Sequence, residues 1–414
     1  MGNSHSDCVY SLRFVSAKFG PGVTEEIGYY ARELGGKEAL LVTDKGIVKA
    51  GLLEHIKRPL EALGIETNVW DDVEPEPSFE SMQKAVDYAS NLNIDIIVGF
   101  GGGSSIDTAK VANLITTHKG DILDYVAPPT GKGRKVPGPC KPLIAVPTTA
   151  GTGSEASPAA IFSLPDQLLK FGFSFDLIKP SLAILDPLMT TTMPPNVTAS
   201  TGMDALSHAI EAYVTWDYDS KPRPKTPTDR PIYEGATIFT DLLTTKSMEL
   251  IQRSLRTAVY SGNNIEARSD MLLASFFAGV AFTNAGLGAV HAASFPVGAK
   301  YHAPHGLVCA ILLPAVMKHN LPSNYRKYAE IARILGEDVG KQSIRKVAES
   351  SVECVKKLME DVAIPIGLVD IGAEERDIPE LARESMKVQR LLKGNPRPVT
   401  QRDMEKILTN ALRN

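Results

Sequence analysis

The chain has 414 residues, 43% of them hydrophobic and 22% charged, which is typical of a globular protein and unlike a disordered or fibrous chain. At about 150 residues per domain, this length favours two domains over a single core. The 44 Lys and Arg against 48 Asp and Glu give a net charge of −4, so no basic excess exists to hold nucleic acid or an anionic membrane.

The cysteines and the first residues bear on the compartment. Four cysteines lie far apart with no Cys-x-x-Cys pair, which disfavours a disulfide framework and a zinc site made of thiolates. No uninterrupted apolar run of about 18 residues occurs. Residues 1–10 are too polar for a signal peptide and lack the arginines of a mitochondrial presequence. We therefore predict a cytoplasmic protein with no membrane or nucleic-acid partner.

Residues 1–190 alternate short apolar runs with amphipathic segments. The apolar runs suit buried parallel strands and occupy 39–43, 65–70, 94–100, 143–146 and 182–185. Apolar residues spaced at three and four predict crossover helices over 24–34, 48–63, 78–92 and 104–116. The alternation predicts a doubly wound, Rossmann-like α/β domain over 1–190.

The third strand ends in a glycine-rich turn. Gly101, Gly102 and Gly103 carry no Cβ, so their backbone N–H groups and the start of the next helix can approach a pyrophosphate. Ser104 is expected to cap that helix, with Asp107 three residues later as in a capping box. The strand, turn and helix together favour a nucleotide phosphate site, although a tight turn without a ligand is the alternative.

Two other segments are candidates for contacts with the nucleotide. Asp44 follows the first strand, where a carboxylate can accept hydrogen bonds from ribose hydroxyls and repel a 2′-phosphate, which favours NAD over NADP. The alternative for Asp44 is an aspartate of an ordinary turn. After the fourth strand, the hydroxyls of Thr148, Thr149, Thr152 and Ser154 form a set of neutral donors, or a turn that caps a helix.

After Met193-Pro194-Pro195 the helical period dominates, which predicts an all-helical domain over 191–414. The expected helices cover 196–213, 239–260, 264–282, 307–318, 325–335 and 342–359, with two more around Glu380 and Met404. The segment 217–231 is too rich in proline for a helix and is either a solvated surface excursion or a lid.

A carboxylate and three histidines mark the helical part. Asp204 and His208 are one helical turn apart, and His291, His302 and His305 follow within a short span. Such oxygen and nitrogen donors suit Fe(II) or Zn(II) better than Mg²⁺ or Ca²⁺. Each histidine alone is more often an ordinary hydrogen-bonding residue, and the spacing does not say which three histidines bind.

These motifs and their order resemble the iron-containing, group III alcohol dehydrogenases, whose architecture is shared with dehydroquinate synthase. The resemblance implies a metal-binding helical domain, with ligands at Asp204, His208, His291 and His305, and a homodimer. It also implies coenzyme contacts at Asp44, Gly102, Gly103, Ser104, Thr148, Thr149, Thr152 and Lys170.

Within that family, the segments 121–126, 131–133, 141–146 and 230–235 are similar to the hydroxyacid-oxoacid transhydrogenases. The resemblance implies a bound coenzyme that passes hydride from 4-hydroxybutyrate to 2-oxoglutarate. One position departs from many members of the family, which have a histidine where this chain has Phe295. A proton relay through that position is excluded, and we predict that the proton leaves through water or through His302 as a catalytic residue.

The predicted activity is metal-dependent hydride transfer between NAD(P) and a primary alcohol or hydroxyacid small-molecule substrate, with Fe²⁺ favoured and Zn²⁺ as the alternative. The transhydrogenase reaction is the alternative, followed by glycerol dehydrogenase-like and dehydroquinate synthase-like activities. A dehydroquinate synthase-like activity requires cations beside the metal to hold phosphate, and the segments 204–208 and 286–306 supply only Lys300. A nucleotide or metal binder without turnover is the remaining rival.

Overall fold

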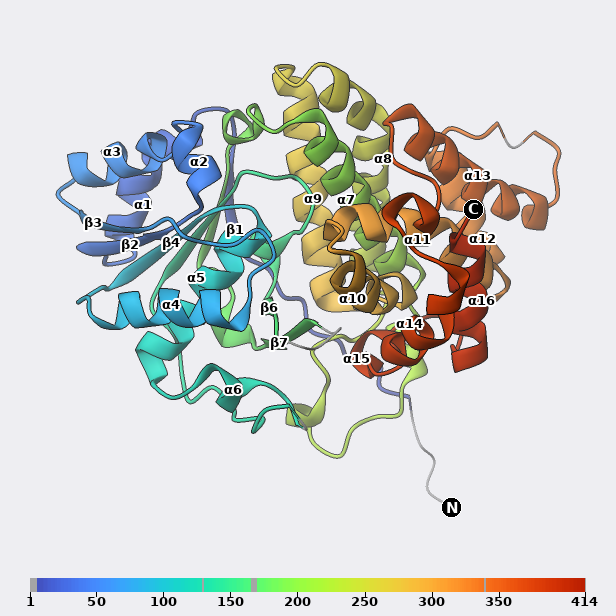
Figure 1. The fold of residues 1–414 in the computed structure, drawn as a ribbon, viewed down its shortest axis with the longest axis horizontal. Helices are drawn as coiled ribbons and strands as arrows, with labels where there is room; N and C mark the ends of the chain where they lie inside the picture. The colour runs from blue at the N-terminus through green and yellow to red at the C-terminus, as the bar shows by residue number, and fades with distance from the viewer. Residues whose placement is uncertain (1–5, 129, 165–169, 339, 414) are drawn as a thin grey trace. The chain divides into compact units, whose positions relative to one another are not determined.

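The computed structural model describes residues 6–128, 130–164, 170–338 and 340–413 (Figure 1). They form two compact units. A sheet unit comprises Phe14–Met193 and Gly262–Leu272, and a helical unit comprises Pro194–Ser261, Leu273–Asn414 and the described residues of Met1–Arg13. The division at residue 190 stays a prediction of domain boundaries, and the compact units differ from it in these two exchanged segments.

The sheet unit contains a six-stranded parallel sheet, of which the apolar runs predicted five strands and missed β1. Its strands follow the order β1-β8-β5-β4-β2-β3. Their bounds are β1 Ser16–Phe19, β2 Glu38–Val42, β3 Glu66–Trp70, β4 Ile96–Gly101, β5 Leu143–Pro147 and β8 Leu182–Leu185. The fold class, α/β with a Rossmann-like sheet followed by a helical part, is confirmed.

Helices cover both faces of this sheet. Neighbouring residues of a strand point to opposite faces, so Leu41 packs in one cluster with Ile56 while Leu40 packs in another with Ala89 and Ala109. Both faces are buried along β2, β4, β5 and β8, which is why these strands read as continuous apolar runs, whereas the edge strands β1 and β3 are more exposed. The helices of this unit are α1 Ile27–Glu33, α2 Lys45–Lys49, α3 Glu54–Ala62, α4 Phe79–Ser90, α5 Gly103–His118 and α6 Ile122–Tyr125.

Other features of the sheet unit also differ from the sequence predictions. The expected helix 48–63 is divided into α2 and α3, because Gly51 between them has a φ of 76°. A small antiparallel pair, β6 Ala159–Ser163 and β7 Lys170–Ser174, follows β5 and was not predicted.

The helical unit is built from α7 to α16, except that the first residues of α9, up to Leu272, belong to the sheet unit. Helix α7 packs against α8 and α11, and α10 packs against α11 and α14. The bounds are α7 Pro195–Val214, α8 Ile238–Tyr260, α9 Ile265–Ala285, α10 Ala289–Tyr301, α11 His305–Asn320, α12 Tyr325–Ile334, α13 Ile344–Asp361, α14 Ile378–Ser385, α15 Gln389–Leu392 and α16 Gln401–Ala411. Helix α10 was not predicted.

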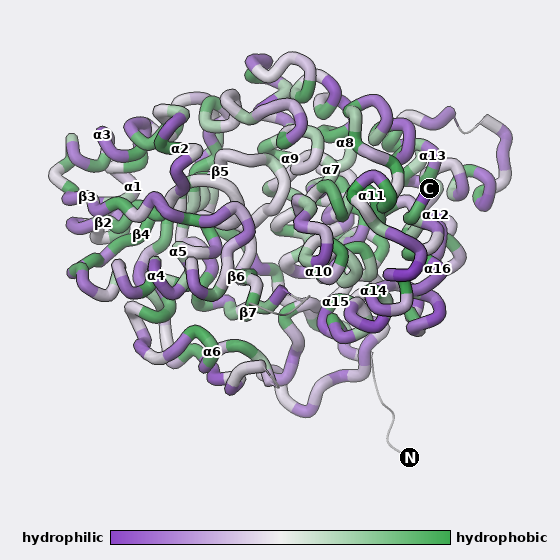
Figure 2. The backbone as a smooth tube through the Cα atoms, in the orientation of Figure 1, coloured by the Kyte–Doolittle hydropathy of each residue, from purple (hydrophilic) through white to green (hydrophobic). Residues whose placement is uncertain are grey.

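The peripheral helices are amphipathic. Figure 2 shows hydrophilic residues along α14 and α16 interrupted by hydrophobic ones. In α16 the buried residues Met404, Ile407, Leu408 and Ala411 recur at three and four positions. Each fully buried leucine or isoleucine contributes about 1.5–3 kcal/mol to folding.

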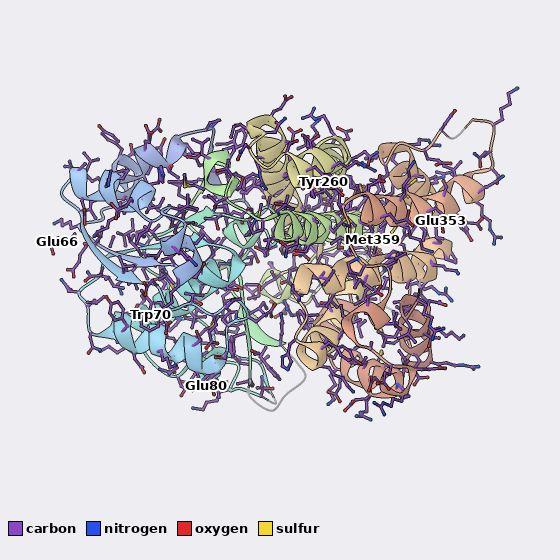
Figure 3. The ribbon with its side chains drawn as sticks, turned by 45° about the horizontal axis from the view of Figure 1, so that its top comes forward. Glu66, Trp70, Glu80, Tyr260, Glu353 and Met359 are labelled. Atoms are coloured by element: carbon purple, nitrogen blue, oxygen red, sulfur yellow. The ribbon has the colours of Figure 1, made fainter. Side chains whose placement is uncertain are left out.

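Polar contacts fasten the end of α8 to α13. The hydroxyl of Tyr260, labelled in Figure 3, donates to the carbonyl oxygen of Asp361 at 2.8 Å. The Arg256 guanidinium pairs with the Asp361 carboxylate at 2.7 Å.

Within the described residues no single helix meets the length and hydropathy needed to cross a membrane. Helices α9 and α10, bent by 108° at their junction, meet these criteria together, by length and composition only.

The proline-rich segment 217–231 is fastened to the N-terminal residues of the chain. Arg230 makes two hydrogen bonds to the Asp7 carboxylate at 2.8 and 3.0 Å. The Asp7 N–H donates to the carbonyl of Lys221 at 2.9 Å, and the Lys221 ammonium lies over the Trp216 ring. These contacts describe an anchored loop, so they favour the surface excursion over the lid.

Candidate metal centre and coenzyme site

The glycine-rich turn joins β4 to α5. Gly101 has a φ of 149°, and a Cβ there would lie 2.4 Å from Ser105 Oγ. A Cβ on Gly103 would lie 2.9 Å from the side chain of Thr152. At Gly102, the N-cap of α5, the nearest atom would be at 3.6 Å, which is an ordinary contact. Gly101 and Gly103 are therefore required by the packing of the turn itself, and Gly102 is the glycine left to admit a ligand.

The capping prediction for Ser104 and Asp107 is wrong. Gly102 is the N-cap, so Ser104 lies inside the first turn of α5, where its hydroxyl donates to the carbonyl of Pro75. Asp107 accepts hydrogen bonds from Lys110 Nζ at 3.1 Å, from Ser154 Oγ and from the Ile161 N–H at 3.0 Å. Its carboxylate thus fastens α5 to β6 and to the loop after β5.

Asp44 lies beside the glycine turn. Its carboxylate caps α2 by accepting from the Ile47 N–H at 3.1 Å and also accepts from Ser105 Oγ at 3.4 Å. A Cβ on Gly101 would approach Asp44 Oδ2 to 3.3 Å. The turn role and the place beside the glycines therefore coexist, and the half-buried carboxylate keeps capacity for further hydrogen bonds.

The threonine-rich loop after β5 packs on the same turn. The Thr148 N–H donates to the carbonyl of Gly101 at 2.9 Å. Thr149 and Thr152 are the residues that Cβ atoms on Gly102 and Gly103 would meet. Asp44, the glycines and three threonines thus converge on the N-terminal end of α5, where backbone N–H groups and the helix dipole favour a phosphate.

Lys170 at the start of β7 is engaged elsewhere, because its ammonium pairs with the Glu76 carboxylate.

Behind the glycine turn lies a group of buried charges. The Lys110 ammonium donates to Ser154 Oγ and to the carbonyl of Ala159, each at 2.7 Å. Glu155 is fully buried, its Oε1 has no hydrogen-bond partner, and burial raises its pKa to about 7.

In the helical unit, three helices bring the predicted metal ligands together. Asp204 and His208 lie one turn apart on α7, His291 lies on α10 and His305 begins α11. A Cβ on Gly306 would lie 2.5 Å from the backbone oxygen of Ser200, so glycine permits the close approach of α11 to α7.

The donor atoms are spaced as ligands of one ion. Asp204 Oδ1 lies 3.7 Å from His291 Nε2 and 3.9 Å from His305 Nε2. Asp204 and His291 are buried, and neither Asp204 Oδ1 nor His291 Nε2 has a hydrogen-bond partner. Unpartnered buried polar atoms are costly, and a divalent cation would satisfy both. The residues therefore fit a metal ion.

The local charges also favour a cation. Burial opposes ionisation of Asp204, but the neighbouring His208, His305 and His291 outweigh it and hold the pKa of this carboxyl below its usual value. Burial likewise opposes a proton on His291, yet Cys309, Asp204 and Glu211 outweigh it and raise its pKa. The same groups that favour a proton here favour a divalent ion.

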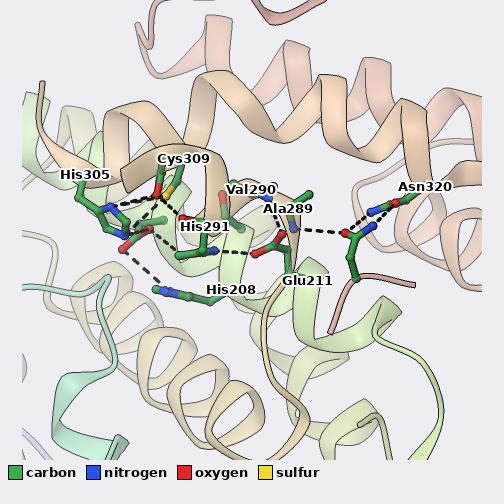
Figure 4. Close-up of polar contacts among 12 residues, drawn as sticks. His208, Glu211, Ala289, Val290, His291, His305, Cys309 and Asn320 are labelled. Carbon is green, nitrogen blue, oxygen red and sulfur yellow. Dashed lines mark hydrogen bonds and ion pairs between the residues drawn. The ribbon is translucent and has the colours of Figure 1, made fainter. Parts of the chain in front are cut away.

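Glu211, one turn beyond His208, orients His291. Its Oε2 accepts from His291 Nδ1 at 2.6 Å and its Oε1 accepts from the Val290 N–H at 2.7 Å, as Figure 4 shows. With the proton on Nδ1, the lone pair of Nε2 faces Asp204. The Asn395 amide accepts from the Ala289 N–H at 3.2 Å and exchanges hydrogen bonds with Asn320.

The other predicted residues take different places. His208 Nδ1 lies 3.9 Å from Asp204 Oδ2, and its ring stacks between Phe282 and His291 with centroids at 4.6 and 4.4 Å. His302 ends α10 in a left-handed conformation, with a φ of 50°, and its side chain is exposed. Phe295 is buried, with its ring centroid 6.1 Å from that of His305.

Sequence reasoning missed two residues of this group. Cys309 lies one turn after His305, and its Sγ lies 3.6 Å from His305 Nε2. The donor atoms of Asp204, His291, His305 and Cys309 all lie within 4.8 Å of one another. The i, i+4 spacing of His305 and Cys309, like that of His208 and Glu211 at i, i+3, was a signal that could have identified them.

The chain matches known families along most of its length. Residues 16–187 match the family described as iron-containing alcohol dehydrogenase, and residues 232–412 match the C-terminal part of the Fe-containing alcohol dehydrogenase family. A Homo sapiens protein named hydroxyacid-oxoacid transhydrogenase, mitochondrial, is 35% identical over 414 residues, covering 96% of this chain and 89% of that protein.

Solved structures agree with this assignment. A 1,3-propanediol oxidoreductase shares 36% identity and a TM-score of 0.89, covering 98% of this chain and all of that one. A sulfoacetaldehyde reductase from Bifidobacterium kashiwanohense, solved in complex with NAD+, shares 29% identity and a TM-score of 0.81, covering 97% and 98% of the two chains.

The relatives correct the predicted compartment. The Homo sapiens protein and its Bos taurus and Pongo abelii counterparts are all named mitochondrial, so the cytoplasmic prediction is wrong and the comparison points to mitochondria. Net charge and hydropathy describe solubility, which does not separate these compartments. By these matches, the chain belongs to the iron-containing alcohol dehydrogenase family, in its transhydrogenase-like subgroup, and is an oxidoreductase that acts on CH–OH groups.

Proposed function

We propose that the chain is a hydroxyacid-oxoacid transhydrogenase that oxidises 4-hydroxybutyrate and reduces 2-oxoglutarate with one retained NAD. The observation that carries the proposal is the buried donor group around Asp204 and His291, in a chain that is similar over nearly its full length to transhydrogenases. Hydride leaves the alcohol carbon of the first substrate and is added to the keto carbon of the second, so no free coenzyme is consumed.

The proposed ligands are Asp204, His208, His291 and His305, with Fe(II) as the ion and Zn(II) as the alternative. When bound, the ion would polarise the alcohol or carbonyl oxygen, and the nicotinamide would carry the hydride. The chain's own residues prepare this chemistry. Asp204 supplies negative charge, Glu211 keeps the proton of His291 on Nδ1, and Phe295 places an apolar ring beside His305.

The proposed coenzyme is NAD. Gly102 would admit the pyrophosphate to the N-terminus of α5, and the hydroxyls of Thr148, Thr149 and Thr152 would donate to it. Asp44 would accept hydrogen bonds from the ribose hydroxyls and repel a 2′-phosphate. Contacts of Gly101, Gly103, Ser104 and Asp107 with the coenzyme remain predictions, and for Lys170 a contact would require release from Glu76.

The first test measures whether coenzyme is released. The protein is loaded anaerobically with Fe(II), and the absorbance of reduced nicotinamide is recorded with free NAD and 4-hydroxybutyrate. We expect at most one equivalent of NADH per chain, and continued consumption of 4-hydroxybutyrate only after 2-oxoglutarate is added. Multiple turnovers that accumulate free NADH would contradict retention of the coenzyme.

The second candidate is a plain alcohol dehydrogenase that releases its coenzyme. It is favoured by the 36% identity to 1,3-propanediol oxidoreductase. A neutral diol as substrate in the same assay separates the candidates. A dehydroquinate synthase-like activity is disfavoured, because Lys300 is already paired with Asp377 at 2.9 Å and with Glu380 at 2.5 Å.

The proposed role of His302 is to exchange the released proton with solvent, for which its exposed position near His305 is suitable. We expect His302→Ala to change the pH profile of turnover while leaving metal content unchanged. An unchanged pH profile would contradict the role. The homodimer implied by the family also remains a proposal, and light scattering of the purified protein tests it.

A further inference from the structure

The two proposed substrates carry an anion at the same place. In 4-hydroxybutyrate, two methylene groups separate the alcohol carbon from the carboxylate. In 2-oxoglutarate, two methylene groups separate the keto carbon from the distal carboxylate. A single cation could therefore hold either acid while its reacting carbon occupies the same position, and an arginine is well suited to bind a carboxylate through two N–H groups.

Arg390 on α15 is a cation of the helical unit that is available for this task. The lysine of α10, the helix that carries His291, is not available, because Lys300 already pairs with Asp377 and Glu380. Two carboxylates neutralise that ammonium. Among the residues that the structure describes, no carboxylate pairs with Arg390, and its side chain is exposed.

Tyr233 holds the guanidinium of Arg390 in place. Arg390 Nη1 donates to the Tyr233 hydroxyl at 2.7 Å, and the guanidinium lies over the Tyr233 ring, 5.6 Å from its centroid. Tyr233 is fixed in turn, because its carbonyl accepts from Lys221 Nζ at 2.9 Å and its side chain packs on Gly286. Most N–H donors of the guanidinium stay available, so Arg390 is oriented but not used up.

A buried apolar cluster connects this arginine to the metal-binding residues. The next residue in the chain, Leu391, belongs to a cluster that also contains Phe282 and Phe295. The Phe282 ring stacks on His208 with centroids 4.6 Å apart, and the Phe295 ring centroid lies 6.1 Å from that of His305. An apolar surface of this kind suits the methylene groups of a substrate and offers no partner to a carboxylate.

Building on the proposed function, we propose that Arg390 binds the distal carboxylate of both acids, 4-hydroxybutyrate during oxidation and 2-oxoglutarate during reduction. Tyr233 is the positioning residue for the guanidinium. The methylene groups of either acid pack against the cluster around Leu391, and the reacting carbon lies at the metal-binding residues. The arginine thus makes the site prefer acids with this spacing over alcohols and oxo acids that lack the distal carboxylate.

The test compares each acid with a counterpart that lacks the distal carboxylate, 1-butanol for 4-hydroxybutyrate and 2-oxopentanoate for 2-oxoglutarate. The full chain is loaded anaerobically with Fe(II) and with NAD or NADH, and single-turnover rates of nicotinamide reduction or oxidation are recorded against substrate concentration. We expect Arg390→Gln to raise the half-saturating concentration of both acids at least about tenfold. Its preference for each acid over the counterpart should fall by a similar factor.

Arg383→Gln is the matched control, because this exposed arginine of α14 pairs with Glu384 at 3.4 Å. We expect it to keep both preferences of the wild type. Arg390→Lys keeps the charge but not the planar fork, and Tyr233→Phe removes the orienting hydroxyl, so both should show intermediate losses. These two variants carry the same comparison if Arg390→Gln fails to fold.

Equal preferences in the arginine variants and the control would overturn the proposal, and so would a loss confined to one of the two acids. Such a result alongside intact hydride exchange between the acids would leave the proposed function standing. A fall in both preferences in a chain that releases free NADH would support the carboxylate site while contradicting the retained coenzyme of the proposed function.

Discussion

At the scale of single residues, we expect the contact between Glu211 and His291 to tune the affinity of the proposed metal site. Glu211→Gln leaves one oxygen for two donors, so either His291 Nδ1 or the Val290 N–H loses its acceptor. We expect Zn(II) affinity, measured by competition with a chelator, to fall about 10- to 100-fold. Glu249→Gln is the control, because that carboxylate is 52% exposed and pairs with Lys246. Equal affinities of the two variants would contradict the role of Glu211.

Glu155 makes stability depend on pH. Burial raises its pKa to about 7 from an ordinary 4.5, so the folded state favours the protonated acid. The contribution of Glu155 to the free energy of unfolding is therefore fully present below pH 4.5 and is lost as the pH rises through 7. In urea unfolding between pH 5 and 8, the free energy of unfolding of the wild type should fall relative to that of Glu155→Gln by up to about 1.4 kcal/mol per pH unit. Parallel pH dependences would be inconsistent with this assignment.

Sequence reasoning identified candidate ligands but not their support. The spacing of Asp204 and His208 indicated a shared face, and the structure brings Asp204, His291 and His305 together. Glu211 and Cys309 were overlooked, because their spacing from His208 and His305 shows only that each pair shares a helix face and does not show which helices pack together. The hydrophobic periodicity of a helix shows which of its faces is buried, but it does not show which distant helix packs against that face.

At the scale of elements, we expect packing and coenzyme binding at the junction of β4 and α5 to depend on different glycines. Gly102 has an extended conformation that alanine tolerates, so Gly102→Ala should cost at most about 1 kcal/mol of stability. Its new methyl group would project toward the phosphate position. We expect NAD affinity, measured by calorimetry, to fall at least about tenfold, equal to about 1.4 kcal/mol.

The matched variant is Gly101→Ala. Gly101 has a φ of 149°, and a Cβ there would approach Ser105 Oγ to 2.4 Å, so this substitution should destabilise the folded protein. We expect a loss of about 1–3 kcal/mol in the free energy of unfolding. If Gly102→Ala instead lowers stability as much and binds NAD normally, the turn is a structural feature without a phosphate.

Some elements could be predicted and others could not. The strands of the sheet core are apolar on both faces and read directly as apolar runs. Helix α10 is buried nearly all round, so it has no amphipathic period, and it contains Pro296 and Gly298. Strand β1 is exposed along its length and was missed for the opposite reason. An amphipathic period marks a helix buried on one face, and a short continuous apolar run marks a strand buried on both; α10 and β1 show neither pattern.

At the scale of the whole molecule, the resemblance to the family was recognised from the order of the motifs along the chain. Length and alternation predicted a sheet part followed by a helical part. Two segments, the described residues of Met1–Arg13 and Gly262–Leu272, belong to the unit on the other side of the predicted boundary. Their placement depends on long-range contacts such as the hydrogen bond from Arg13 N–H to Asn284 Oδ1 at 2.8 Å. Periodicity carries no information about such pairings.

The central claim is that one bound coenzyme passes hydride between two organic acids. The most direct measurement uses 4-hydroxybutyrate deuterated at its alcohol carbon, together with 2-oxoglutarate and an excess of unlabelled NADH in solution. We predict that the product 2-hydroxy acid carries deuterium at its new C–H position, undiluted by the free NADH, because the coenzyme stays bound. A product that carries hydrogen from the free NADH would contradict the account.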